Sequence, residues 1–272
     1  MNGRRLSTLM LGSMIIFLVL SLILSPLFMG LGLSQEMQTK DRIIKTFAEK
    51  APQQWGERVK GVKTKLDTDQ KVLALTFDAC GGLKGSGYDA KLMEYLEREQ
   101  ISATFFISGR WIDANPEIFK KLSKNILFEI ENHGLNHKPC SALGYSAYGI
   151  EGTKSVGEIF NEIEWNALKI QTLTGRKPRY YRPGTAYCDE ICVEIAKTLG
   201  YEVVNFSVRG DAGATYSKKR VGEALFNAPP SSIILMHMNH PEKETAEGLI
   251  EALPELKKRG FRFVKLSEFG LR

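Results

Sequence analysis

Short apolar runs alternate with amphipathic stretches along the chain from residue 71 onward. Seven runs have the length and composition of buried strands, at residues 72–77, 103–107, 126–130, 179–182, 202–206, 233–236 and 261–264. Helical spacing of apolar residues marks the segments between them, at 88–100, after 115, and at 156–173, 189–199, 220–227 and 246–259. Strands that alternate with helices predict βα units around a parallel sheet. Seven such units favour a (β/α) barrel over an open doubly wound sheet.

The first 65 residues differ in character from the rest. Arg4 and Arg5 precede a stretch without charge that runs to Gln35, and residues 14–24 are apolar apart from one serine. Such a run can span a bilayer, and positive charge before it predicts that the remainder is translocated. An anchor is favoured because no Ala-x-Ala site follows, while Pro26 leaves cleavage of a signal peptide open. We therefore expect a membrane anchor or signal segment (1–35), a stem or linker (36–65) and a catalytic domain (66–272) outside the cytoplasm, on the periplasmic or extracellular face.

Polar residues follow five of the predicted strands at the point where each strand ends. They are Asp78 after the first strand, His133 and His137 after the third, Arg182 at the fourth, Asp211 past the fifth and His237 at the sixth. Barrels built from βα units assemble their active sites at this edge. Each residue alone has a structural explanation, such as a turn aspartate or a core histidine. Their common position predicts an enzyme.

Two of the four histidines, His133 and His137, stand four residues apart in the stretch 132–137. A tight loop or one helical turn can direct both rings at one point, and imidazole is the commonest metal ligand in proteins. Two surface histidines would be the usual explanation for this spacing by itself. The preceding strand and the other strand-end residues favour a metal site.

These residues together resemble the polysaccharide deacetylase family, which includes chitin and peptidoglycan N-deacetylases, over roughly residues 66–266. The stretch 75–79 is similar to the family's Thr-Phe-Asp-Asp, 131–137 to Asn-His-Ser/Thr-x-x-His, 181–184 to Arg-x-Pro-Tyr/Gly, and 235–237 to Leu-x-His, whereas 209–211 is only loosely similar to the family's paired aspartates. The resemblance implies a distorted (β/α)7 barrel. It also implies a metal held by His133 and His137, a base at Asp78, an acid at His237, and orienting roles for Arg182 and Asp211.

Two departures from the family pattern bear on this site. Ala79 stands where the family has a metal-binding aspartate, and Gly134 replaces the Ser/Thr of the histidine loop. Because catalytic zinc usually has three protein ligands, either Asp78 or Cys80 is needed beside the two histidines. If Asp78 binds the metal, Asp211 or Glu131 becomes a candidate base.

The implied reaction is removal of an N-acetyl group from an amino-sugar polymer with the help of a divalent ion, for which zinc is expected. A catalytically silent, membrane-anchored relative that binds glycan and acts in polysaccharide assembly or export is the main alternative. A hydrolase of the same fold acting on another amide or an ester is a third hypothesis. The net charge of +6 is spread along the sequence without a basic cluster, which argues against nucleic acid as a partner.

Four cysteines lie in the predicted domain, and three of them follow polar motifs by a few residues. If those motifs converge in space, two of the sulfur atoms can come within bonding range. Disulfides are permitted in a translocated protein. We predict a bond between Cys80 and Cys188.

Overall fold

The computed structural model describes residues 36–272. The chain divides into two compact units, of which the second, Phe47–Arg272, holds the sheet, the helices around it and the candidate site. The described part of the first unit, residues 36–46, is helical.

The predicted membrane segment, residues 1–35, lies outside the described residues. Across residues 36–272 there is no helix with both the length and the apolar character that crossing a bilayer requires. The prediction of a membrane anchor, and the location outside the cytoplasm that was derived from it, are therefore not supported and are withdrawn.

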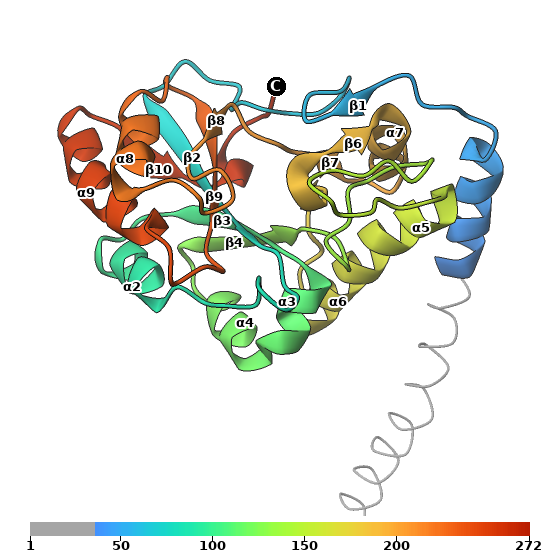
Figure 1. Ribbon diagram of the computed structural model, residues 1–272, viewed down its shortest axis with the longest axis horizontal. Helices are drawn as coiled ribbons and strands as arrows, with labels where there is room; N and C mark the ends of the chain where they lie inside the picture. Colours follow the sequence, from blue (N-terminus) through green and yellow to red (C-terminus); the bar gives the residue numbers. More distant parts are fainter. Residues whose placement is uncertain (1–35) are drawn as a thin grey trace, which may run out of the picture. The chain divides into compact units, whose positions relative to one another are not determined.

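A parallel sheet forms the centre of the second unit (Figure 1). Its strands are β2 (Val72–Ala79), β3 (Ala103–Ile107), β4 (Phe128–Asn132), β5 (Tyr180–Tyr181), β7 (Glu202–Val203), β8 (Val208–Arg209), β9 (Ser232–His237) and β10 (Arg262–Val264). They are ordered β7-β5-β4-β3-β2-β9-β8, and β10 pairs with the first half of β2. All eight residues of β2 are buried, as expected for a strand covered on both faces.

The sheet must curl, because its two edge strands are neighbours in the sequence. Only residues 204–207 separate β7 from β8, although these strands stand at opposite ends of the sheet. Such a link reaches at most roughly 18 Å. The expected barrel class is thus confirmed in its coarser form, a curled parallel sheet surrounded by helices. All seven predicted strands are present, and β8 was not predicted.

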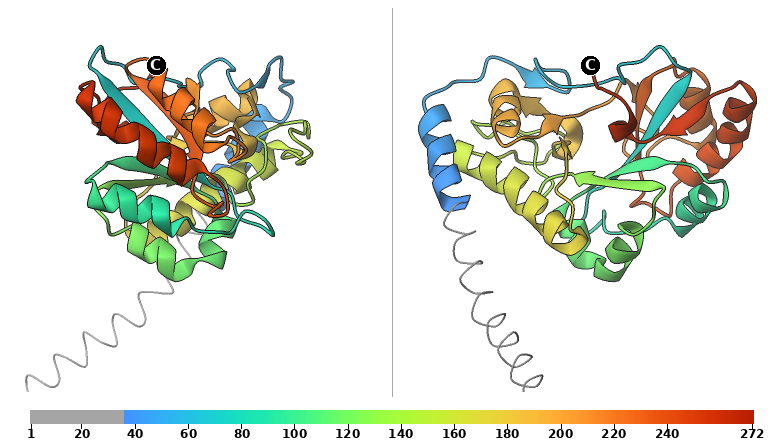
Figure 2. Two further views of the ribbon diagram at one scale, coloured as in Figure 1. Left: turned by 60° about the vertical axis from the view of Figure 1, so that its left-hand side comes forward. Right: turned by 180° about the vertical axis from the view of Figure 1, so that it is seen from behind.

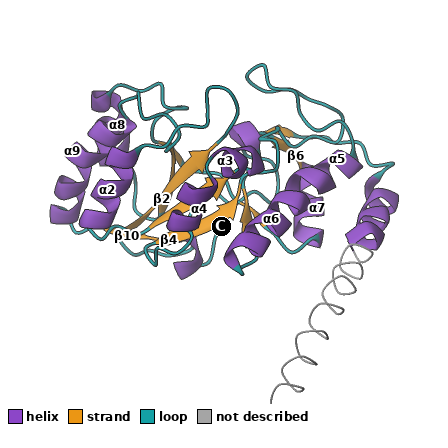
Figure 3. Cartoon of the chain, turned by 90° about the horizontal axis from the view of Figure 1, so that it is seen from below, coloured by secondary structure: helices purple, strands orange, loops and turns teal. Residues whose placement is uncertain are grey.

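Helices pack around this sheet and bury its apolar side chains. They are α2 (Ala90–Arg98), α3 (Gly109–Ala114), α4 (Pro116–Leu122), α5 (Val156–Phe160), α6 (Asn166–Thr174), α7 (Glu190–Thr198), α8 (Lys218–Phe226) and α9 (Thr245–Lys258). Helix α9 packs against both α2 and α8 at one end of the sheet, as two further views also show (Figures 2 and 3). A π-helical turn, Asn161–Trp165, joins α5 to α6, and left-handed Gly175 ends α6. Helix α3 was not predicted.

Residues ahead of the predicted domain boundary at 66 belong to the same compact unit. Strand β1 (Trp55–Gly56) pairs antiparallel with β6 (Cys188–Asp189), so that Trp55 lies opposite Asp189. Lys63 forms a bridge with Val204 farther along. This part of the predicted linker therefore contributes strand pairing to the folded unit, which begins at Phe47.

Candidate metal and active site

The carboxyl ends of the strands border a pocket of about 440 Å³. Its lining includes Asp78, Cys80, His137, Thr185 and His237. These residues come from the ends of β2 and β9 and from the loops after β4 and β5. The pairing of β2 with β9 sets Asp78 directly beside His237 in the sheet. The strand ends therefore bring distant parts of the sequence together, as the sequence pattern predicted.

Asp78 forms a buried ion pair with Arg182. The Nη1 atom of Arg182 donates to Oδ1 of Asp78 at 2.7 Å and to the hydroxyl of Thr76 at 3.0 Å. Its Nε and Nη2 atoms donate to backbone carbonyls of Val204 and Asn205, both at 3.1 Å. The Arg182 side chain is fully buried, and burial lowers its pKa while the charge of Asp78 raises it. Arg182 thus holds Asp78 from behind and does not reach the pocket.

His133 and His137 lie against one another beside this pair, with ring centroids 4.8 Å apart. The Nδ1 atom of His133 is 2.8 Å from the carbonyl oxygen of Arg182, which leaves Nε2 directed at Asp78 Oδ2, 3.4 Å away. A backbone carbonyl on one ring nitrogen is a common way to orient a metal-ligating histidine. Burial lowers the pKa of His133, but the charge of Asp78 and contacts with Cys80 raise it overall.

Cys80 completes a cluster of three donors with these histidines. Its sulfur and one ring nitrogen from each of His133 and His137 all lie within 4.8 Å of one another. Ligand atoms of one tetrahedral zinc ion lie roughly 3.3–3.8 Å apart, so the three donors must move closer together to hold one ion. Burial raises the pKa of the Cys80 thiol, but the charge of His137 and hydrogen bonds from the neighbouring histidines outweigh it and leave the pKa well below its usual value.

Strand geometry explains why Cys80 reaches the site and Ala79 does not. Successive residues of a strand point to opposite faces, so that positions 78 and 80 share one face. Ala79 is fully buried among the apolar side chains of the main core. Of the two third ligands that the sequence left open, Cys80 is the one that the structure groups with both histidines.

The histidine loop is braced by Glu162 from the π-helical turn. One Glu162 oxygen accepts the backbone N–H groups of Asn136 and Lys138, both at 2.9 Å. A Cβ atom at Gly134 would lie 2.5 Å from that same oxygen. The glycine that replaces the family's Ser/Thr therefore leaves room for a carboxylate that holds both sides of His137. Glu162 was not predicted from the sequence, although π-helical turns are frequent at functional sites.

His237, which stands beside Asp78 in the sheet, is paired with Asp211. One Asp211 oxygen lies 2.9 Å from His237 Nδ1, and the other accepts the backbone N–H of His237 at 2.7 Å and the hydroxyl of Thr245 at 3.0 Å. Burial lowers the pKa of His237, but the charge and hydrogen bond of Asp211 dominate with help from Cys80, so that the pKa is well above its usual value. The arrangement leaves His237 Nε2 as the ring nitrogen that Asp211 does not hold.

Unusual backbone conformations gather around the same pocket. Within residues 36–272, eight non-glycine residues have a positive φ, and five of these line the pocket: His137, Tyr148, Thr185, Ala186 and Ala212. Conformations of this kind cost free energy and concentrate at functional sites. The Thr185 hydroxyl is also buried without a hydrogen-bond partner among the described residues. A polar atom in that state is free to bind a water molecule or a ligand.

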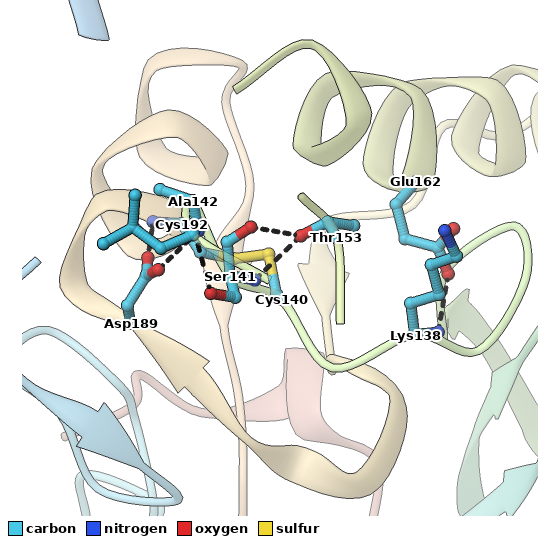
Figure 4. Close-up of a disulfide and its surroundings, with 9 residues drawn as sticks. Lys138, Cys140, Ser141, Ala142, Thr153, Glu162, Asp189 and Cys192 are labelled. Carbon is cyan, nitrogen blue, oxygen red and sulfur yellow. Dashed lines mark hydrogen bonds between the residues drawn. A yellow bond between two sulfur atoms is a disulfide. The ribbon is translucent and has the colours of Figure 1, made fainter. Parts of the chain in front are cut away.

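The predicted disulfide is wrong. Cys140 and Cys192 are bonded to each other, whereas Cys80 and Cys188 are free. The bond joins the loop after the histidine pair to the first turn of α7, where the Asp189 carboxylate accepts hydrogen bonds from nearby backbone N–H groups (Figure 4). Cys80 instead lies next to the histidines, with its sulfur 4.0 Å from Nε2 of His133.

Glu131, considered as a substitute base, belongs to another part of the molecule. Its Oε2 atom accepts the backbone N–H groups of Arg179 and Tyr180, at 2.8 and 2.6 Å. Its carboxylate lies beside a separate cavity together with Glu129 and Lys177. Glu131 therefore braces the start of β5 and does not face the candidate site.

A sequence profile of the polysaccharide deacetylase family matches residues 65–204. The chain belongs to the polysaccharide deacetylase family. Peptidoglycan-N-acetylglucosamine deacetylase of Bacillus cereus is 29% identical over 211 residues, which cover 76% of this chain and 92% of the relative. Peptidoglycan-N-acetylmuramic acid deacetylase PdaA of Bacillus subtilis is 26% identical over 210 residues, which cover 74% and 72%.

Solved structures show the same fold. The structure of Bacillus subtilis PdaA, described as a family 4 carbohydrate esterase, matches 84% of this chain and 87% of its own with a TM-score of 0.63 at 25% identity. A CE4 family pseudoenzyme from Bacillus anthracis matches 74% of this chain and 66% of its own with a TM-score of 0.62 at 23% identity. The fold is therefore common to proteins described as active and as inactive, and the residues of the pocket must decide between them.

Proposed function

We propose that this chain is a metal-dependent hydrolase that removes N-acetyl groups from an amino-sugar polymer, with cell-wall peptidoglycan as the leading substrate. The observation that carries the proposal is the meeting of a three-donor cluster, a buried Asp–Arg pair and a His–Asp pair around one pocket. Two of the relatives are named as peptidoglycan deacetylases, which supports the choice of polymer.

The donor set fits a divalent transition metal. Cys80, His133 and His137 provide one sulfur and two nitrogens, a combination suited to zinc or cobalt and unsuited to magnesium or calcium. A divalent ion held there supplies Lewis acidity, which polarises the acetamide carbonyl and eases deprotonation of water. Because Cys80 supplies the third donor, the alanine at position 79 does not leave the site short of ligands.

Asp78 is the proposed general base. Its Oδ1 atom is held by Arg182, and its carboxylate lines the pocket. The buried guanidinium orients this carboxylate, so that Asp78 can accept a proton from the attacking water. Arg182 acts as a positioning residue, because its side chain is fully buried behind Asp78.

His237 is the proposed general acid, and Asp211 positions it. The hydrogen bond between Nδ1 and Asp211 orients the ring and stabilises its protonated form, and the second Asp211 oxygen holds the backbone N–H of His237. His237 can then protonate the departing sugar amine. The unpartnered hydroxyl of Thr185 is available to the acetyl oxygen or to a sugar hydroxyl.

Acetate release from an N-acetylated glycan tests the activity. The full-length chain is stripped of metal, reconstituted with zinc or cobalt, and assayed on peptidoglycan and on N-acetylglucosamine oligomers. His237→Asn is expected to lower kcat by about 10²- to 10⁴-fold, the usual contribution of a general acid. His240→Asn is the matched control, because His240 pairs with Glu242 and does not line the pocket. Activity that survives both His133→Ala and Asp78→Asn would exclude the metal mechanism.

Spectroscopy of the cobalt-loaded protein tests the ligand set without relying on turnover. A thiolate ligand gives a charge-transfer absorption in the near ultraviolet, which Cys80→Ser should abolish and Cys188→Ser should retain, since Cys188 is the other free cysteine. If the band is absent from the unaltered protein, Cys80 is not a ligand. Unaltered glycan binding without acetate release from any substrate would favour the silent relative instead.

A further inference from the structure

A row of four aromatic rings leads away from the catalytic pocket. Tyr148 lines that pocket and contacts Tyr187, with ring centroids 5.5 Å apart. Tyr187 contacts Trp55 at 5.8 Å, and Trp55 contacts Tyr145 at 5.4 Å. Trp55 and Tyr145 line a second pocket of about 350 Å³, together with Pro52, Gln53, Gln54 and Ser146. The proposed catalytic groups do not use this second pocket.

Several cross-connections hold this row in place. Trp55 is fixed by the pairing of β1 with β6, which immediately follows Tyr187 in the sequence. The loop that carries Tyr145 and Tyr148 is tied to α7 by the disulfide between Cys140 and Cys192. The Asp189 carboxylate also accepts hydrogen bonds from the backbone N–H groups of Ala142 and Cys192, at 2.6 and 2.8 Å (Figure 4). The aromatic row is therefore preorganised on paired backbone and is not carried by a free loop.

The row is accessible to solvent and combines aromatic rings with nearby amide side chains, a combination that suits sugar binding. Tyr145 is 42% exposed and Tyr148 is 70% exposed, although large aromatic side chains are normally buried. Exposed apolar patches that adjoin a pocket mark binding surfaces. A pyranose ring has an apolar C–H face, which packs on an aromatic ring, and a rim of hydroxyl groups, which bind amide side chains such as Gln53 and Gln54.

We infer that the second pocket is a subsite for a sugar of the same glycan strand whose N-acetyl group occupies the catalytic pocket. The inference rests on the proposed function and specifies its substrate as an extended strand of several pyranose units. Continuity favours this occupant, since Tyr148 borders the catalytic pocket and Tyr187 links it to Trp55. An occupant unconnected to the reaction would not need the row to join the two pockets.

Kinetics on N-acetylglucosamine oligomers of increasing length test this inference. For the unaltered chain, kcat/KM is expected to rise by roughly tenfold or more from the disaccharide to the hexasaccharide, as one or two stacked rings would contribute. Trp55→Ala and Tyr145→Ala should remove most of this increase and leave the disaccharide rate unchanged. Trp55→Phe, which retains a ring, should keep part of it. Leu143→Ala is the matched control, because Leu143 is an exposed residue of the same loop that lines neither pocket.

Calorimetric titration with the hexasaccharide separates this inference from the proposed function. In one outcome, neither the unaltered chain nor any variant releases acetate, but Trp55→Ala binds the hexasaccharide at least several-fold more weakly than the unaltered chain does. The subsite then stands and the catalytic proposal fails. Equal kcat/KM for all oligomer lengths, or hexasaccharide affinity that Trp55→Ala leaves unchanged, would overturn the subsite. Thermal unfolding of each variant shows whether a loss reflects binding or folding.

Discussion

Replacing Arg182 by leucine should destabilise the domain strongly, because the residue is a fully buried half of an ion pair. Its guanidinium makes hydrogen bonds to Asp78, Thr76 and two backbone carbonyls, and it also lies 4.0 Å from the ring centroid of Phe106. The substitution leaves the Asp78 carboxylate buried without its main partner. Removing one member of a buried pair costs about 3–5 kcal/mol. For a domain of this size, that loss corresponds to a fall in Tm of roughly 6–20 °C.

Urea and thermal unfolding followed by circular dichroism measure this loss. Arg209→Leu is the matched control, since Arg209 pairs with Glu57 at 2.6 Å but its side chain is 43% exposed. An exposed pair contributes at most about 1 kcal/mol, so the two variants differ in burial and not in distance. The double variant with Asp78→Asn should recover part of the loss, because it removes the stranded charge. A loss for Arg182→Leu no larger than that of the control would refute the reasoning.

Two further substitutions test the geometry of the site. Asp211→Asn removes the charge that raises the pKa of His237, while burial continues to lower that pKa. Because the acid must be protonated, the alkaline limb of the kcat/KM profile should move to lower pH. An alkaline limb that does not move would show that another group sets it. Gly184→Ala would place a Cβ atom 2.3 Å from the carbonyl of His137. His137, a proposed metal ligand, would have to move, and metal binding should weaken by about 10- to 100-fold in equilibrium dialysis. Gly222→Ala, whose nearest contact is 3.8 Å, is the control, and equal metal affinities in both glycine variants would contradict the close approach.

The strand-end pattern predicted most of the site because it depends on local information. An apolar strand followed by Asp78 or His237 can be recognised from neighbouring residues, and parallel strands bring their carboxyl ends to one edge. The function of Cys80 could be raised but not decided in this way. Only the folded chain groups its sulfur with both histidines and brings Arg182 to Asp78 from more than a hundred residues away.

Other features of the site had no local signal. Glu162 lies on a π-helical turn, which the spacing of apolar residues does not predict. Only the folded chain brings its carboxylate to the histidine loop. Cysteine pairing likewise depends on which loops meet. Cys192, in the first turn of α7, is bonded to Cys140 in the loop after the histidine pair, whereas Cys80 is free. Disulfides of this kind join residues far apart in the sequence, so local sequence patterns do not predict them.

By itself, the sequence determined the βα order, the family and the chemical types available at the strand ends, because these follow from the period of apolar positions and from short motifs. Tertiary structure alone decided which donors converge, which carboxylate is held by a buried arginine, and how Trp55 comes to stand beside Tyr187. The reason is physical: a strand period fixes which face a side chain takes, whereas the partner on that face is chosen by the packing of distant segments.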